Sequence, residues 1–90
     1  MDLRQLEIFV TAYEKGSLSR AAECLNTSQP NVSKNIRALE EELGRPLLVR
    51  SGKGVQPTAF GRAVLEYAMI MRKAAEKLAS LACLLYTSDA

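Results

Sequence analysis

The sequence contains no histidine and no tryptophan, and its two cysteines, Cys24 and Cys83, do not have the spacing of metal ligands. Histidine is the commonest general base and metal ligand near neutral pH, so its absence argues against acid–base catalysis and against a metal centre. The chain also lacks a glycine-rich phosphate loop and paired carboxylates in a pocket-like context. We therefore expect no enzymatic activity, no cofactor and no metal.

Long hydrophobic runs and a secretory signal are also missing. No apolar stretch approaches the ~20 residues that span a bilayer, and residues 1–5 lack the basic-then-apolar pattern of a signal peptide. We therefore expect no membrane association and a cytoplasmic location. Cys24 falls within an apolar helical pattern, which favours a buried structural thiol over a reactive one.

Two helices are predicted in the first 25 residues. The spacing of apolar residues predicts a helix over about residues 3–15, with Asp2 as its N-cap and Gly16 at its end. A second, short helix is predicted over about residues 19–25, with its start near Ser17. Small alanines on its buried side would let a following helix approach closely, and a short polar turn separates the two.

A third helix is predicted over about residues 29–43. Ser28 is a suitable N-cap, Pro30 lies in the first turn where its missing N–H costs nothing, and Gly44 ends the helix. At ~100° per residue one side is apolar and faces the core: Val32, Ile36, Leu39 and Leu43. The opposite side is small, polar and basic: Pro30, Ser33, Lys34 and Arg37.

A short helix, a tight turn and a longer helix with one basic side form the arrangement that places a second helix in the DNA major groove. The charge distribution agrees. Residues 28–62 carry six basic and three acidic side chains, a net charge of +3, although the whole chain carries only +2. The acidic run Glu40–Glu42 is interpreted as a solvated helix face, and because phosphates repel it we expect only the first half of the helix to enter the groove.

Two short β-prone runs, residues 47–50 and 55–57, flank a glycine-rich tip and predict a hairpin, or wing. Arg50 and Lys53 at this tip can reach a phosphate backbone. The alternative is a solvated turn.

A long helix is predicted from the N-cap Thr58 to at least Leu81, with an apolar residue every three or four positions. These residues are Phe60, Val64, Tyr67, Ile70 or Met71, Ala74 and Leu78. A helix of this length is too long for a small domain to bury alone, which favours packing on another chain. The alternative is a helix folded back on its own domain.

Residues 1–82 resemble the N-terminal part of LysR-type transcriptional regulators. The most specific match is Ser28-Gln29-Pro30 followed by Ser33 and Leu39-Glu40. The remaining matches lie around it: Leu3, Leu6, Phe9, Gly16-Ser17, Ala21-Ala22, Leu25, Ile36, Leu43-Gly44, Leu47-Leu48, Arg50, Thr58 and Gly61.

The resemblance implies a mainly α fold, a winged helix-turn-helix with a three-helix core and a β-hairpin wing, over residues 1–57. Residues 58–82 would form a linker helix through which the protein dimerises on double-stranded DNA. The residues that would face the major groove are Ser28, Gln29, Pro30, Ser33 and Lys34. Those that would lie near phosphates are Arg37, Arg50 and Lys53. Gln29 and Ser33 are the best candidates for base edges, because both donate and accept hydrogen bonds.

Three positions depart from the family pattern. Lys34 stands where arginine is common, Asn31 where a small residue is common and Asn35 where glutamine is common. Lysine lacks the planar fork that arginine offers to guanine, so Lys34 is expected to contact a phosphate or a single base acceptor.

The family's effector-binding domain has no counterpart within this chain, so an effector site is expected to be absent from it. Residues 83–90 do not resemble the family's continuation and match a translated transposase-adapter sequence, so we expect them to be a non-native tail. Two alternatives to DNA binding remain, a module that only dimerises and a non-functional fragment of a regulator gene.

Overall fold

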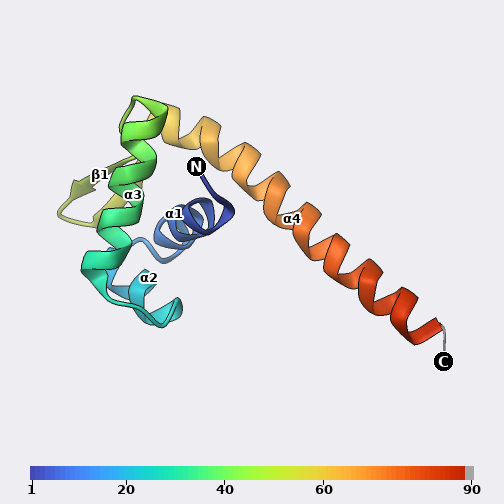
Figure 1. Ribbon diagram of the computed structural model, residues 1–90. Coiled ribbons are helices and arrows are strands. Elements are labelled where there is room, and N and C mark those ends of the chain that lie inside the picture. Colours follow the sequence, from blue (N-terminus) through green and yellow to red (C-terminus); the bar gives the residue numbers. More distant parts are fainter. Residues whose placement is uncertain (89–90) are drawn as a thin grey trace.

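The computed structural model describes residues 1–88, with side chains to residue 83. Six elements follow one another: α1 (Leu3–Lys15), α2 (Leu18–Cys24), α3 (Gln29–Leu43), β1 (Leu48–Ser51), β2 (Gly54–Pro57) and α4 (Ala59–Ser88). The three short helices and the hairpin form a head, here residues 1–57, and α4 projects from it as a long straight arm (Figure 1). The predicted fold class is confirmed.

Side-chain caps and left-handed glycines set the ends of the first three helices. The Asp2 carboxylate accepts the Gln5 amide at 2.8 Å, and the Ser28 hydroxyl accepts the Asn31 amide at 3.3 Å. Gly16 ends α1 at φ 67°, and Gly44 ends α3 at φ 80°. The predicted bounds of α1 and α3 are confirmed, whereas α2 begins and ends one residue earlier than predicted.

The core lies on two sides of α1. One cluster joins α1 to α3, α4 and the residue before β1: Leu6, Phe9, Val10, Leu39, Leu47, Leu65 and Ala68. The other joins α1 to α2 and α3: Ile8, Ala12, Ala21, Ala22, Val32 and Ile36. Burying each large apolar side chain contributes about 1.5–3 kcal/mol, so α1 is the element on which the head is assembled.

The wing is fixed to the head by backbone contact. β1 and β2 pair antiparallel, with Leu48 opposite Pro57 and Ser51 opposite Gly54. The Val55 amide donates to the Gly16 carbonyl at 3.1 Å. A Cβ on Gly54 would collide with that same carbonyl, and its φ of +111° also favours glycine. The segment is therefore a docked hairpin, as predicted, and not a solvated turn.

The joint between head and arm is also a close backbone contact. The Thr58 amide donates to the Leu47 carbonyl at 3.0 Å, and the Thr58 hydroxyl donates to the Pro46 carbonyl at 2.7 Å while accepting the Gly61 amide at 2.9 Å. Gly61 is buried, and a Cβ there would strike the Leu47 carbonyl. Glycine at this position lets α4 start directly against the chain that leads into β1.

Only the first part of α4 packs on the head. Leu65 and Ala68 are buried in the core, and the Arg72 guanidinium binds the Glu14 carboxylate of α1 through two hydrogen bonds of 3.0 and 2.9 Å. Farther along, Leu78 is 67% exposed. The folded-back alternative therefore holds only for the first turns of α4. The helix runs through residue 83 without a break, so the expected division at that position remains a prediction.

One prediction from the sequence is wrong and another holds only in part. Cys24 is exposed, because it is the last residue of α2 and lies about 110° around the helix from the midpoint between the buried Ala21 and Ala22. The run Glu40–Glu42 is a solvated face at Glu41 and Glu42, whereas the half-buried Glu40 accepts the Leu47 amide at 2.7 Å.

Gly61→Ala is expected to lower the melting temperature by about 4–8 °C, because overpacking costs about 1–3 kcal/mol and a net loss of ~1 kcal/mol shifts a domain of this size by that amount. The better helix propensity of alanine offsets only part of this cost. Thermal unfolding followed by circular dichroism tests it. Gly52→Ala is the matched control, since a Cβ there meets no atom within 4 Å, and an equal effect of both variants would contradict the close-contact interpretation.

The Arg72 guanidinium donates to Glu14 and so lowers the pKa of that carboxyl below its ordinary value of 4.5. The carboxylate thus stabilises the fold above pH 4.5, and this contribution is lost as the pH falls through the lowered pKa. Glu14→Gln is expected to reduce stability at pH 7 by up to ~1 kcal/mol, as for an exposed ion pair. Urea unfolding at several pH values should show the difference from wild type shrinking as the pH falls below 4.5 and through the lowered pKa. A difference that persists there would exclude the ion pair as its cause.

Candidate nucleic-acid interface

The outward side of α3 forms a polar, basic ridge. Its exposed residues Pro30, Lys34 and Arg37 lie opposite the buried Val32 and Leu39, as the helical step requires. In the ribbon view α3 runs along the outer edge of the head, and β1 lies beside it (Figure 1). The ridge is therefore open to solvent and is bordered on one side by the wing.

A shared hydroxyl connects α3 to the wing. The Gln29 amide Nε2 donates to Ser33 Oγ at 3.1 Å, and the Arg50 guanidinium from β1 donates to the same oxygen at 3.5 Å. Gln29 and Ser33 are half-buried, whereas Arg50 is exposed. These two hydrogen bonds join three predicted site residues and leave the Arg50 guanidinium beside the exposed ridge.

Six of the eight predicted site residues line one open depression between α3 and β1. They are Gln29, Pro30, Ser33, Lys34, Arg37 and Arg50, with Ala38 and Glu41 completing it. The depression brings three cations together with two side chains that both donate and accept hydrogen bonds. Its one carboxylate, Glu41, lies towards the C-terminal part of α3, which leaves the first half of the helix positively charged.

Ser28 and Lys53 lie outside this depression. Ser28 is exposed and its hydroxyl caps α3 by accepting the Asn31 amide. Lys53 is exposed at the tip of the wing, between β1 and β2. Ser28 thus positions the start of α3, and Lys53 extends the basic surface away from the helix.

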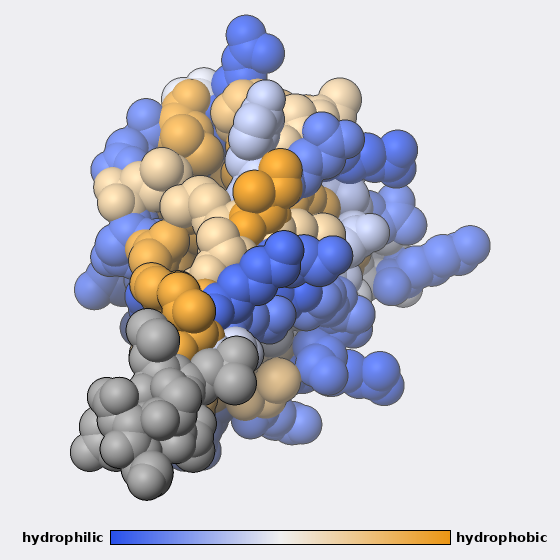
Figure 2. Space-filling view, turned by 90° about the vertical axis from the view of Figure 1, so that its right-hand side faces the viewer, coloured by the Kyte–Doolittle hydropathy of each residue, from blue (hydrophilic) through white to orange (hydrophobic). Residues whose placement is uncertain are grey.

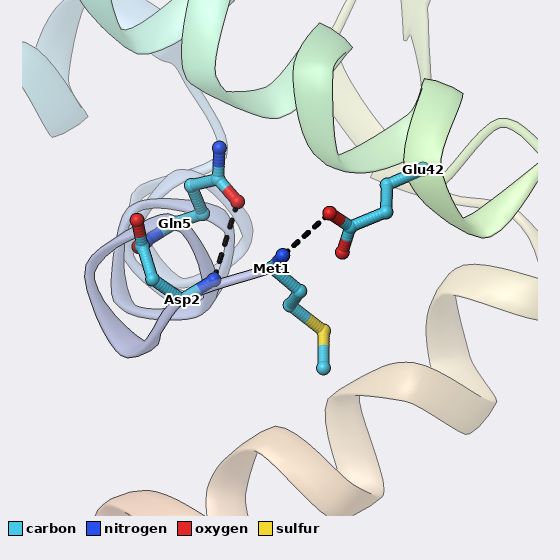
Figure 3. A network of polar contacts seen from close by, with 4 residues as sticks. All are labelled: Met1, Asp2, Gln5 and Glu42. Atoms are coloured by element: carbon cyan, nitrogen blue, oxygen red, sulfur yellow. Dashed lines mark hydrogen bonds and ion pairs between the residues drawn. The ribbon is translucent and has the colours of Figure 1, made fainter.

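The other two acidic residues of α3, Glu40 and Glu42, have binding partners within the head. The Glu40 carboxylate accepts the amide of Leu47, the residue preceding β1. The Glu42 carboxylate faces the amine of Met1, beside the capping contact between Asp2 and Gln5 (Figure 3). Both carboxylates are satisfied within the head, so they add less repulsion towards an approaching anion than three solvated ones would. Glu40 also fastens the wing to α3.

A second polar row on α3 was not assigned a role from the sequence. The Asn31 amide Nδ2 donates to Thr27 Oγ1 at 3.0 Å, and the Asn35 amide donates to the Asn31 backbone carbonyl at 2.8 Å and to its Oδ1 at 3.3 Å. The signal available in the sequence was the four-residue spacing of Thr27, Asn31 and Asn35, which places polar side chains on one strip of a helix.

The residues that the structure describes hold no group of three or more His, Cys, Asp or Glu side chains suited to a metal ion. Among them, no helix combines the length and apolarity needed to cross a bilayer.

Comparison with known proteins agrees with this geometry. Residues 3–62 match the model of the bacterial regulatory helix-turn-helix proteins of the lysR family. The HTH-type transcriptional regulator AbaB of Streptomyces antibioticus is 52% identical over 61 residues, which are 68% of this chain and 20% of that protein. The SDS degradation transcriptional activation protein of Pseudomonas sp. (strain ATCC 19151) is 54% identical over 67 residues, which are 74% of this chain and 22% of that protein. The chain thus spans about a fifth of the length of these relatives.

Solved structures match the fold over nearly the whole chain. The DNA-binding domain of BenM in complex with catB site 1 DNA superimposes with a TM-score of 0.89 at 35% identity, covering 94% of this chain and 96% of that one. The complex of the CbnR DNA-binding domain with DNA gives a TM-score of 0.84 at 36% identity, covering 94% and 98%. With the family model matched over α1 to the start of α4 and the winged architecture shared, this chain belongs to the LysR family of helix-turn-helix regulators.

Proposed function

We propose that this chain is the sequence-specific DNA-binding module of a transcription regulator, with α3 in the major groove and the wing on the backbone. The observation that carries the proposal is the basic depression between α3 and β1, in which Gln29, Ser33 and Arg50 are already ordered. The similar BenM and CbnR domains were solved with DNA, which supports the same ligand here. The module acts by binding, without catalysis, and in the cytoplasm.

Each side chain of the interface has a role that follows from its chemistry. Gln29 and Ser33 read base edges, and Lys34 contacts a base acceptor or a phosphate. Arg37, Arg50 and Lys53 bind phosphates and supply most of the salt-dependent affinity. The roles at the start of α3 are different: Ser28 caps the helix, and Pro30 starts it with a compact surface that can approach the groove closely.

A second copy of this chain is the proposed partner of α4. Along its length α4 exposes large apolar side chains, with Tyr67 at 69%, Ile70 at 63% and Leu78 at 67% exposure. Viewed from the side towards which the arm points, apolar side chains extend from the grey end of the chain back onto the head, with hydrophilic side chains beside them (Figure 2). Pairing of two arms would bury these residues and give two recognition helices for two half-sites.

A dimerisation-only module is the alternative that this exposed arm favours. Such a chain would pair with a full-length regulator and bind DNA weakly by itself. A non-functional fragment would neither pair nor bind. DNA affinity of the folded chain at low salt separates both from the proposed function.

The salt dependence of DNA binding tests the ridge. We expect affinity for a random-sequence duplex to fall steeply with salt, and Lys34→Ala/Arg37→Ala to reduce the slope of log K against log[salt] by about 2, since each phosphate contact contributes about 0.9. Fluorescence anisotropy of a labelled duplex across a salt series measures it. Lys73→Ala/Lys77→Ala is the matched control, because it removes the same charge from the exposed arm. The ridge assignment fails if the control lowers the slope as much.

Base reading by Gln29 is tested by comparing two duplexes. Gln29→Ala should cost about 1–3 kcal/mol on a duplex selected for tight binding but little on random DNA, because only the selected site offers the matching base edge. The change also removes the hydrogen bond to Ser33, so circular dichroism must confirm an unaltered fold. Equal losses on both duplexes would show that Gln29 contributes to general affinity and reads no base.

A further inference from the structure

Asn31 occupies a position on α3 from which a third base could be read. It is exposed and is the third residue of the helix, within the N-terminal turn that such helices direct at base edges. By the helical step Asn31 lies about 60° from Lys34, on the side away from Ser33. The residues proposed above to contact DNA are Lys34 and those on the side of α3 that faces the wing. Asn31 is next to Lys34 on the opposite side of the helix, to which no contact has yet been assigned.

The hydrogen bonds around Asn31 fix which way its amide points. Its Nδ2 donates to Thr27 Oγ1 one turn earlier, and its Oδ1 accepts from the Asn35 amide one turn later. Its backbone amide is held by Ser28 Oγ at 3.3 Å. A side chain held by residues one turn before and one turn after it loses less conformational freedom on binding than a freely rotating one.

The bonds that Asn31 makes leave part of its capacity unused. A primary amide has two N–H donors and two acceptor lone pairs, and one of each is committed to Thr27 and Asn35. One donor and one acceptor therefore remain on neighbouring atoms of a solvent-facing group. In the major groove, adenine presents the complementary pair, the N7 acceptor beside the N6 donor, and asparagine is a preferred partner for it.

We propose that Asn31 is a specificity-determining residue that reads an adenine beside the base pair reached by Lys34. The inference rests on the proposed function, because it requires α3 to lie in the major groove. It gives the chain a base preference on the flank of α3 away from the wing, and this preference is separate from the reading by Gln29 and Ser33.

The test is selection from a randomised duplex library with the full chain, followed by affinity measurements on the selected duplex. Wild type is expected to select an A·T pair at one position of each half-site. Asn31→Ala should lose that preference, bind the selected duplex about tenfold more weakly and keep its affinity for random DNA within twofold. Its base preferences at all other positions should be unchanged.

Asn31→Asp separates base reading from a structural role. Aspartate keeps the shape, still accepts the Asn35 amide and is favourable in the first turn of a helix, so it should preserve the melting temperature. It cannot donate to adenine N7, and a carboxylate prefers the cytosine N4 donor. The preference at this one position should therefore shift from A·T towards C·G, after normalising for the weaker overall affinity that an added negative charge causes.

The possible outcomes distinguish this inference from the function on which it rests. If wild type selects no motif, the proposed function fails. If wild type selects a motif and Asn31→Ala selects the same one with the same preference at every position, DNA reading stands and the role of Asn31 is overturned. Equal weakening on selected and random duplexes would also overturn it, by making Asn31 a backbone contact.

Discussion

The packing of apolar side chains on both sides of α1 is the interaction on which the rest of the molecule depends. Phe9 and Val10 anchor α4 and the entry to β1, whereas Ile8 and Ala12 hold α2 and the first half of α3. A helix that is buried on two sides leaves its neighbours little freedom to shift, because protein interiors are close-packed. The orientation of the basic ridge on α3 thus depends on core residues that are not part of the ridge.

Leu47 is a single residue that contacts the core, α3 and the start of α4. Its side chain is fully buried in the core, its amide donates to Glu40 of α3, and its carbonyl accepts from Thr58 at the start of α4. Recognition helix, wing and arm therefore meet at one residue. The Glu40 carboxylate can accept the Leu47 amide only because the hairpin follows α3 after a short turn.

Local signals in the sequence were sufficient for the helices and the wing. Caps such as Asp2 and Ser28 and terminal glycines such as Gly16 and Gly44 act within a few residues, so helix bounds follow from the sequence nearby. The hairpin likewise follows from two β-prone runs around a glycine-rich tip. The general position of the basic ridge was predictable for the same reason, because about half a helical turn separates it from the core face.

Features that depend on distant parts of the chain were not predictable. The exposure of Cys24 follows from how little of the seven-residue α2 is covered, and the partner of Glu40 is seven residues away across a turn. The contact between Glu14 and Arg72 spans 58 positions. The polar row around Asn31 was visible as spacing, but its hydrogen-bond directions required coordinates. The roles of individual residues on DNA remain predictions.

The arm also has a mechanical consequence. An α-helix of 30 residues is about 45 Å long, and α4 is held to the head along its first half, by the Leu47 joint, the buried Leu65 and Ala68, and the Glu14–Arg72 pair. The part of α4 beyond Arg72, residues 73–88, extends about 24 Å from the last of these contacts. A change of about 5° in the direction of this part would displace its far end by roughly 2 Å. In a dimer paired through α4, as proposed above, the contacts that orient α4 on the head would thus set the distance between the two basic ridges.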